Sequence, residues 1–477
     1  MVTSRITLID KALIPGGSTV VRLLEFDGRQ RDCWIRIWNQ ENAGYFAAAG
    51  INEFALPDNR RNGRAKVLAL AKQPLLLLML ALYDSEGNAL RKSKSLDRTI
   101  LYDSLLRRFV KREMTKDKGF SEQSPKEQEA TLDAEMQRLA IAALGMYNRQ
   151  KLHILSDELN DDINFFSLQR PCTVSEGREL SQAELLLGRF FFVHKSEAQV
   201  RAGSPIHSEE TAAFEFLHNT FGEFLTADFI LRQAVNEAAA LRALQENEDL
   251  RLQLEQRLNA ADGMGRAWFA SLVYTPLFSR PVILEMMREW IAHALKRKGM
   301  DKQDFLTHLD VIVLNQVRRL LKKREMPSII RKKTAQEGFR APFGDHPLLG
   351  HIAIYSMNLM LLRVIVDDEA FEFNENLIGT HEDGARPWDR LAHVWRSWFA
   401  LDHLNGITAI LESKRYESKI RLGTKERFQI AESQSRLETY MNVAVSLADD
   451  IGAGLIGLSA MKHLGTINWI FRRLTDA

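Results

Sequence analysis

From Arg31 onward, the apolar residues of the chain recur at the spacing of an α-helix. Side chains three and four positions apart share one face of a helix, and an apolar face must be buried against another element. A chain of 477 residues with this pattern is expected to fold mainly as packed helices, in about three domains. The expected helices start near Trp34, Pro74, Leu96, Leu132 and Asn219 or cover 65–70, 238–258, 281–296, 305–323, 351–365, 389–411 and 436–447.

Charge, cysteine content and hydropathy exclude several classes of protein. Lys and Arg number 64 against 62 Asp and Glu, a formal net charge of +2, so no global charge favours nucleic acid or acidic lipid. Cys33 and Cys172 are too few for a disulfide framework or a CxxC-type zinc site. The longest apolar stretch, 75–82, is too short to cross a bilayer, and the N-terminus has no signal-peptide pattern. We therefore expect a cytoplasmic protein without a membrane partner.

A few segments depart from the helical pattern. Residues 18–26 are rich in β-branched side chains after a Pro-Gly-Gly turn, which predicts a strand left over from a larger sheet. The aromatic runs 190–194 and 213–217 flank a polar loop, which predicts a β-hairpin or wing. The polar stretch 116–128 is expected to be a linker between domains.

His218 stands where the second hairpin strand gives way to a helix that begins near Asn219, the expected N-cap. The first N–H groups of a helix have no partner within the helix, and together with the helix dipole they attract anions such as phosphate. The position makes His218 a candidate phosphate contact. A histidine at this place can also simply cap or pack, so both interpretations stay open.

Two nucleotide-binding patterns fail in their context. Residues 452–457 match GxGxxG, but about 20 residues follow, too few for the roughly 30-residue unit, so close packing of helices is the better interpretation. Residues 364–369 resemble a Walker B strand, but the 477 residues contain no GxxxxGK[ST], so this run is expected to end a helix.

The basic run 318–333 is expected to be a solvated helix face, with a partner or nucleic-acid patch as the alternative. No catalytic arrangement or metal-ligand spacing is recognisable.

Five short segments occur in an order that is more specific than any one of them. They are 2–5, which contains Arg5; 20–26 followed by 34–39; 70–78, which contains Pro74; 101–109 (LYDSLLRRF); and 214–227 (FEFLHNTFGEFLTA), which contains His218. In this order they resemble sensor 1, the next core strand with the lid helix, the helical-domain proline motif, the helix leading into the winged-helix domain, and the winged-helix histidine motif. These are motifs of the NACHT branch of the bacterial, NLR-like STAND signal-transduction ATPases.

The resemblance implies a binding role for three residues. Arg5 would face the terminal phosphate of the nucleotide, Pro74 would abut the adenine, and His218 would read the diphosphate of bound ADP and hold the closed state. The resemblance also implies five parts. They are the end of an α/β nucleotide-binding core (1–50), a helical domain (51–115), a winged-helix-like domain with a β-hairpin (116–235), a helical region (236–335) and a C-terminal helical sensor or interaction region (336–477).

In the family, the P-loop and the magnesium-binding acids precede sensor 1, and this chain begins at sensor 1. The resemblance therefore implies the regulatory and sensor portion of a switch ATPase in anti-phage defence or signalling, with no catalytic activity alone. ATP or ADP with Mg²⁺ would bind only together with a P-loop polypeptide. A protein trigger would act on the C-terminal helices, and activation could bring homo-oligomerisation. Two other interpretations stay open, an α-helical protein-interaction scaffold without a nucleotide role and, disfavoured by the balanced charge, DNA binding through the winged helix.

Overall fold

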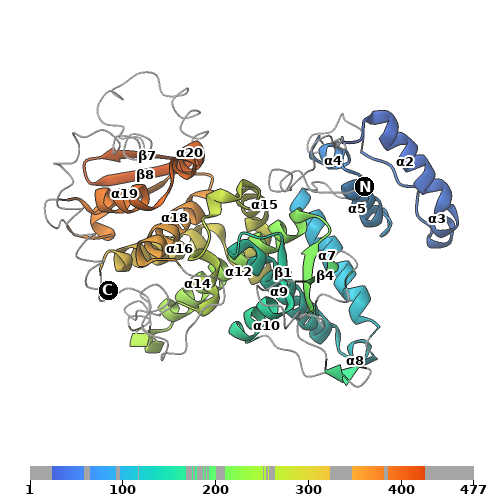
Figure 1. Ribbon diagram of the computed structural model, residues 1–477, viewed down its shortest axis with the longest axis horizontal. Coiled ribbons are helices and arrows are strands. Elements are labelled where there is room, and N and C mark those ends of the chain that lie inside the picture. The colour runs from blue at the N-terminus through green and yellow to red at the C-terminus, as the bar shows by residue number, and fades with distance from the viewer. Residues whose placement is uncertain are drawn as a thin grey trace. The chain divides into compact units, whose positions relative to one another are not determined.

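The computed structural model is mainly helical, which confirms the predicted fold class at this level (Figure 1). Contacts divide the chain into two compact units, 1–101 and 102–477, which are described separately below. Arg5, most of the strand predicted at 18–26, the helix predicted at 436–447 and the GxGxxG match lie outside the described residues. The structure describes residues 24–57, 65–92, 97–116, 118–167, 174–175, 178–179, 186, 190, 193–199, 210–250, 252–253, 256, 264–322, 346–380 and 385–424.

The first unit consists of short helices whose ends follow local sequence signals. Asp27 and Gln30 form a capping box at the start of α2, and Pro74 occupies the first turn of α5, where its missing N–H costs nothing. The predicted helices at 65–70 and from Pro74 are both confirmed. The elements of this unit are α2 (Gly28–Glu41), α3 (Ala43–Ala49), α4 (Ala65–Leu70), α5 (Pro74–Asp84) and α6 (Ala89–Lys92), and α7 (Arg98–Met114) continues into the second unit.

The second unit opens with helices around a small antiparallel sheet in the order β1–β5–β4. Its first elements are α8 (Lys118–Ser121), α9 (Pro125–Asn148), β1 (His153–Leu155), α10 (Ser156–Phe165), β2 (Val174–Ser175), β3 (Arg178–Glu179), β4 (Val193–Gln199), β5 (Glu210–Phe216) and α12 (Asn219–Glu246). The linker predicted at 116–128 is wrong in part, because it contains α8 and the start of α9. A capping box between Ser124 and Glu127 and a proline at the first helical position start α9 inside that polar stretch.

The predicted hairpin is confirmed, with strands shifted from the predicted ranges. β4 and β5 pair from Val193↔Phe216 to Gln199↔Glu210, and β1 pairs with the other edge of β5 through Ile154↔Phe214. Phe214 is fully buried and Phe216 nearly so, which places one face of β5 in the core. The sheet therefore presents the end of β5, and His218 after it, at the start of α12.

The remainder of the second unit is helical, with a second three-stranded antiparallel sheet in the order β6–β8–β7. Figure 1 shows this sheet, in orange and red, next to α19 and α20. Its elements are η1 (Glu248–Leu250), α14 (Arg266–Leu272), η2 (Leu277–Ser279), α15 (Pro281–Lys298), α16 (Lys302–Leu320), α18 (Leu348–Ile365), β6 (Phe371–Asn374), η4 (Glu375–Leu377), α19 (Pro387–Trp398), α20 (Leu401–Ile410), β7 (Leu411–Tyr416) and β8 (Lys419–Thr424).

Two helix predictions in this region are wrong. The helix predicted at 389–411 is divided into α19 and α20, and Leu411 already starts β7. The two helices expected from Asn219 and over 238–258 are one helix, α12, which ends at Glu246. Its buried face runs on without a Gly or Pro between Phe229 and Ala238, so nothing in the chain interrupts it.

α18 lies in the core of the second unit. Among the described residues, it is the one helix long and apolar enough to cross a membrane, and 89% of its span is buried inside the fold. It packs against α14, α15, α16 and α19. A helix that is apolar on all sides is expected at such a central position.

Replacing Gly145 by alanine is expected to destabilise the second unit by about 1–3 kcal/mol. A Cβ atom there would overlap Oδ2 of Asp162 and would lie 2.8 Å from Cδ1 of Ile154 and 2.9 Å from Nη1 of Arg149. Asp162 cannot easily yield, because Arg149 holds both of its oxygens at 2.7 Å. The measurement is the urea midpoint of unfolding. Gly119→Ala is the matched helical control, with no atom within 4 Å of the added Cβ, and an equal shift in both variants would contradict the steric explanation.

Candidate functional site

His218 is the N-cap of α12, so the prediction of Asn219 as the cap is wrong by one residue. Its backbone is extended, with φ −135° and ψ 131°, and its half-buried side chain turns back toward the first turn of the helix. Nδ1 accepts a hydrogen bond from the backbone N–H of Thr220 at 3.3 Å and lies 2.6 Å from Oγ1 of the same residue. The ring therefore satisfies one of the N–H groups that a helix start leaves unpaired.

A tyrosine from α7 completes this cluster. The hydroxyl of Tyr102 donates to Oγ1 of Thr220 at 2.8 Å, across 118 positions of sequence. Its ring is 1% exposed and packs edge-on against Phe221, with centroids 5.6 Å apart, and beside Phe224 at 6.0 Å. Three polar side chains, Tyr102, Thr220 and His218, thus form one hydrogen-bonded row at the start of α12. Sequence reasoning found only the last of them.

The other two predicted nucleotide contacts are not joined to His218 by the described structure. Pro74 is the first residue of α5 in the first unit, and His218 belongs to the second unit. Arg5 lies outside the described residues. The binding roles of all three remain predictions.

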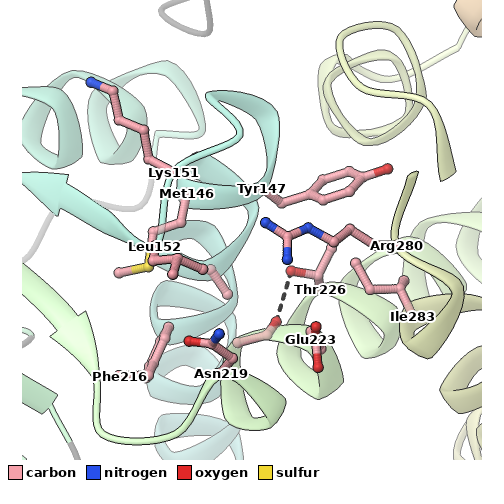
Figure 2. A pocket seen from close by; sticks show the side chains of 12 residues that line it. Met146, Tyr147, Lys151, Leu152, Phe216, Asn219, Glu223, Thr226, Arg280 and Ile283 are labelled. Atoms are coloured by element: carbon pink, nitrogen blue, oxygen red, sulfur yellow. Dashed lines mark hydrogen bonds between the residues drawn. The ribbon is translucent and has the colours of Figure 1, made fainter. Parts of the chain in front are cut away.

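A small pocket opens beside the first turns of α12 (Figure 2). Its walls come from α9, the loop before β1, β5, α12 and the start of α15, and its volume of about 40 Å³ has room for about three water molecules. Figure 2 shows Arg280 reaching toward Thr226, whereas Lys151 points away from the other lining side chains. Among the residues that line it are Tyr147, Lys151, Phe216, Asn219, Glu223, Thr226 and Arg280. The pocket is too small to enclose a nucleotide.

Further along α12, the buried carboxylate of Asp228 fixes the helix to its neighbours. Asp228 is 5% exposed and accepts a hydrogen bond from Nε1 of Trp290 at 2.6 Å. Arg232 pairs with it at 3.1 Å and Arg297 at 3.5 Å. Burial alone would raise the pKa of Asp228, but these two cations and the indole hydrogen bond lower it below its ordinary value. Arg297 also binds Asp103 of α7 at 2.6 Å and lies over the ring of Trp290.

The structure describes the Walker B-like run at 364–369 and the first part of the basic run at 318–333. α18 ends at Ile365, just before the acidic residues of the Walker B-like run, which confirms the helix-end interpretation. Asp367 of that run pairs with Arg363 at 2.9 Å. In the basic run, the expectation of a solvated face is wrong for Arg319, which is 1% exposed because it points into the core from α16. Within the described part of the chain, no group of three or more His, Cys, Asp or Glu side chains is placed to hold a metal ion.

Comparisons of the chain with protein-family models, with curated proteins and with solved structures find no match. The site must therefore be interpreted from its own residues. They form a helix N-terminus that is capped by a histidine, with the hydroxyl groups of Thr220 and Tyr102 hydrogen-bonded behind the ring and a small pocket beside the first turns of the helix.

Proposed function

We propose that this chain is the regulatory and sensor portion of a NACHT-type STAND switch ATPase, acting in the cytoplasm in bacterial anti-phage defence or signalling. The observation that carries the proposal is the place of His218. It follows directly on a sheet in the order β1–β5–β4, with α9 before β1 and α10 after it, and it caps the next helix. This order of elements supports the assignment to a winged-helix domain, in which His218 would be the histidine of the family motif.

The chemistry of the site suits a phosphate group. α12 is 28 residues long, so its N-terminus carries the full partial positive charge of a helix dipole, and an imidazole N–H is a donor for a phosphate oxygen. The neighbouring pocket has room for only a few waters, so these residues fit a contact to the diphosphate of ADP and not a complete nucleotide site. The 477 residues contain no GxxxxGK[ST] motif, so the P-loop and the magnesium-binding acids would have to be supplied in addition to them, with Pro74 and Arg5 as further contacts.

In this proposal, the C-terminal helices receive a protein trigger and the nucleotide holds the resting state. A ligand shifts such an equilibrium only if it binds the two states with different affinity. ADP would favour the state in which His218 contacts the diphosphate. The trigger would favour the other state, which could homo-oligomerise.

The test is titration calorimetry of ADP and ATP on the full chain, alone and with a P-loop polypeptide. We expect binding only with the added polypeptide, and we expect His218→Ala to weaken ADP binding about tenfold, as loss of a hydrogen bond to a charged group does. His218→Asn is the matched control, because asparagine also caps a helix but does not reproduce Nε2. We expect it to lose affinity as His218→Ala does. If His218→Asn bound ADP as tightly as the wild type, His218 would act only as the helix cap and would not contact the diphosphate.

Absence of ADP and ATP binding under every condition would overturn this proposal and favour the second candidate, a helical protein-interaction scaffold. One observation favours that candidate independently. α2 buries none of its residues, and Ile37 of α2 and Tyr45 of α3 are 52% and 50% exposed. Such apolar side chains at a surface suit a protein partner. Nucleic acid is the least favoured partner, because the net charge is only +2. If DNA binding through phosphate contacts did occur, its affinity should fall steeply as the salt concentration rises.

A further inference from the structure

We propose that Tyr102 and Thr220 are positioning residues that hold the ring of His218 in the tautomer with its proton on Nε2. This inference deepens the proposed function and rests on it, because Nε2–H is then the donor offered to a phosphate oxygen. Neither Tyr102 nor Thr220 needs to touch the ligand. They act through the opposite edge of the imidazole.

The backbone decides the role of Nδ1. The N–H of Thr220 points at Nδ1 from 3.3 Å, and a backbone N–H can only donate. Nδ1 must therefore present its lone pair. If Nδ1 carried the proton, two N–H groups would face each other at the capped end of the helix, where the positive dipole already opposes them.

The two hydroxyl groups reinforce this choice. Oγ1 of Thr220 accepts the proton of the Tyr102 hydroxyl at 2.8 Å, so its own proton is free to point elsewhere. Nδ1 of His218 lies within hydrogen-bond distance of it, 2.6 Å away, and can accept this proton. The row thus runs in one direction, from Tyr102 through Thr220 to Nδ1, and the ring proton belongs on Nε2.

The row also connects the imidazole to α7. Tyr102 is fixed by its packing against Phe221 and Phe224, and the next residue, Asp103, is held by Arg297 at 2.6 Å. A shift of α7 against α12 would separate the tyrosine hydroxyl from Thr220 and release the tautomer. Tyr102, Thr220 and His218 all belong to the second unit, so the row lies within that unit.

The experiment is nitrogen NMR of the full chain with ¹⁵N-labelled histidine, in which His218 is assigned from the signal lost in His218→Asn. We expect the wild type to show a protonated Nε2 and an unprotonated Nδ1. Tyr102→Phe and Thr220→Val should each shift the tautomer ratio roughly fivefold toward Nδ1–H, as loss of one neutral hydrogen bond does. Thr220→Ser keeps the hydroxyl and should restore the wild-type ratio. Thr226→Val is the matched control in α12, since its hydroxyl bonds Gly222.

The outcomes separate this inference from the proposed function. A proton on Nδ1 in the wild type would contradict the proposed role of Tyr102 and Thr220. An unchanged tautomer ratio in both Tyr102→Phe and Thr220→Val would contradict it as well. The expected ratios support the row whether or not nucleotide binds. If ADP then binds with the P-loop polypeptide, Tyr102→Phe should weaken it about fivefold. If ADP binds in no variant, the proposed function fails while the positioning of His218 stands.

Discussion

Asp228→Ala is expected to lower the free energy of unfolding of the second unit by about 3–5 kcal/mol. The carboxylate receives the indole N–H of Trp290 at 2.6 Å and pairs with Arg232 at 3.1 Å and Arg297 at 3.5 Å. Without it, the buried indole N–H of Trp290 and the guanidinium of Arg232 lose this partner, whereas Arg297 keeps its pair with Asp103. The Arg297 side chain remains 32% exposed, so water can reach it and the loss should fall toward the lower end of that range. The measurement is urea-induced unfolding at neutral pH.

The same carboxylate gives this variant a characteristic pH dependence. Because Arg232, Arg297 and Trp290 together lower the folded-state pKa of Asp228, its contribution is present above the unfolded pKa of about 4 and is lost as the pH falls through the folded value. The stability difference between the wild type and Asp228→Ala should therefore be constant from pH 7 to about 5 and shrink below about 4. Glu246→Ala, which breaks an exposed pair with Arg242 on the same helix, is the control and should change stability by about 0.5 kcal/mol or less. Equal losses in the two variants would contradict the role given to burial.

The parts of the fold that local chemistry determines could be predicted from the sequence. Pro74 starts α5 because a proline suits the first turn of a helix, and the two aromatic runs before His218 indicate a hairpin because they flank a polar loop. α12 starts at Asn219 because the chain turns from strand to helix there. Each of these signals lies within a few residues of the element that it specifies.

The strands that depend on distant partners could not be predicted in this way. β1 has three residues and becomes a strand only by pairing with β5, far along the chain. β7 starts at Leu411 directly after α20, with neither Gly nor Pro at the change from helix to strand, so the helical pattern seemed to continue. β6 and β8 likewise pair across a long separation in sequence. Tertiary contacts decide such segments, and periodicity does not report them.

In the candidate site too, local features could be predicted from the sequence, whereas contacts between distant residues could not. The sequence places His218 next to the start of the helix, although the predicted cap was Asn219, one residue later. His218 contacts Thr220, and Thr220 accepts a hydrogen bond from Tyr102 of α7. Tyr102 and Thr220 are 118 positions apart in the sequence, and no local pattern links them. Asp228 likewise meets Trp290 only after α12 and α15 have packed.

Asn358→Ala is expected to lower the free energy of unfolding by about 2–4 kcal/mol, since it removes the side-chain partner of two buried backbone groups at about 1–2 kcal/mol each, while the carbonyl of Thr275 keeps the hydroxyl of Tyr147 as a donor. Asn358 is fully buried in α18. Its amide donates to the carbonyl oxygens of Leu272 and Thr275, and its oxygen accepts from the N–H of Leu277, each at 2.8 Å. No other side chain can take these positions, because the gap left by alanine is enclosed by the core. Urea-induced unfolding measures the loss, with Asn405→Ala as the exposed control, expected to change stability by about 0.5 kcal/mol or less.

This asparagine also bears on how a switch could move. Thr275, which Asn358 holds, donates to the carbonyl oxygen of Asn148 at 3.1 Å and accepts from the hydroxyl of Tyr147 at 3.1 Å, both at the end of α9. The loop between α14 and α15 therefore joins the helix before β1 to the central helix of the C-terminal part. We expect Asn358→Ala to speed hydrogen exchange at the amide of Leu277 and to loosen this junction. Unchanged protection there, with a loss of stability below about 1 kcal/mol, would mean that the junction is held by apolar packing, and that a trigger at the C-terminal helices would have to act on α9 by another route.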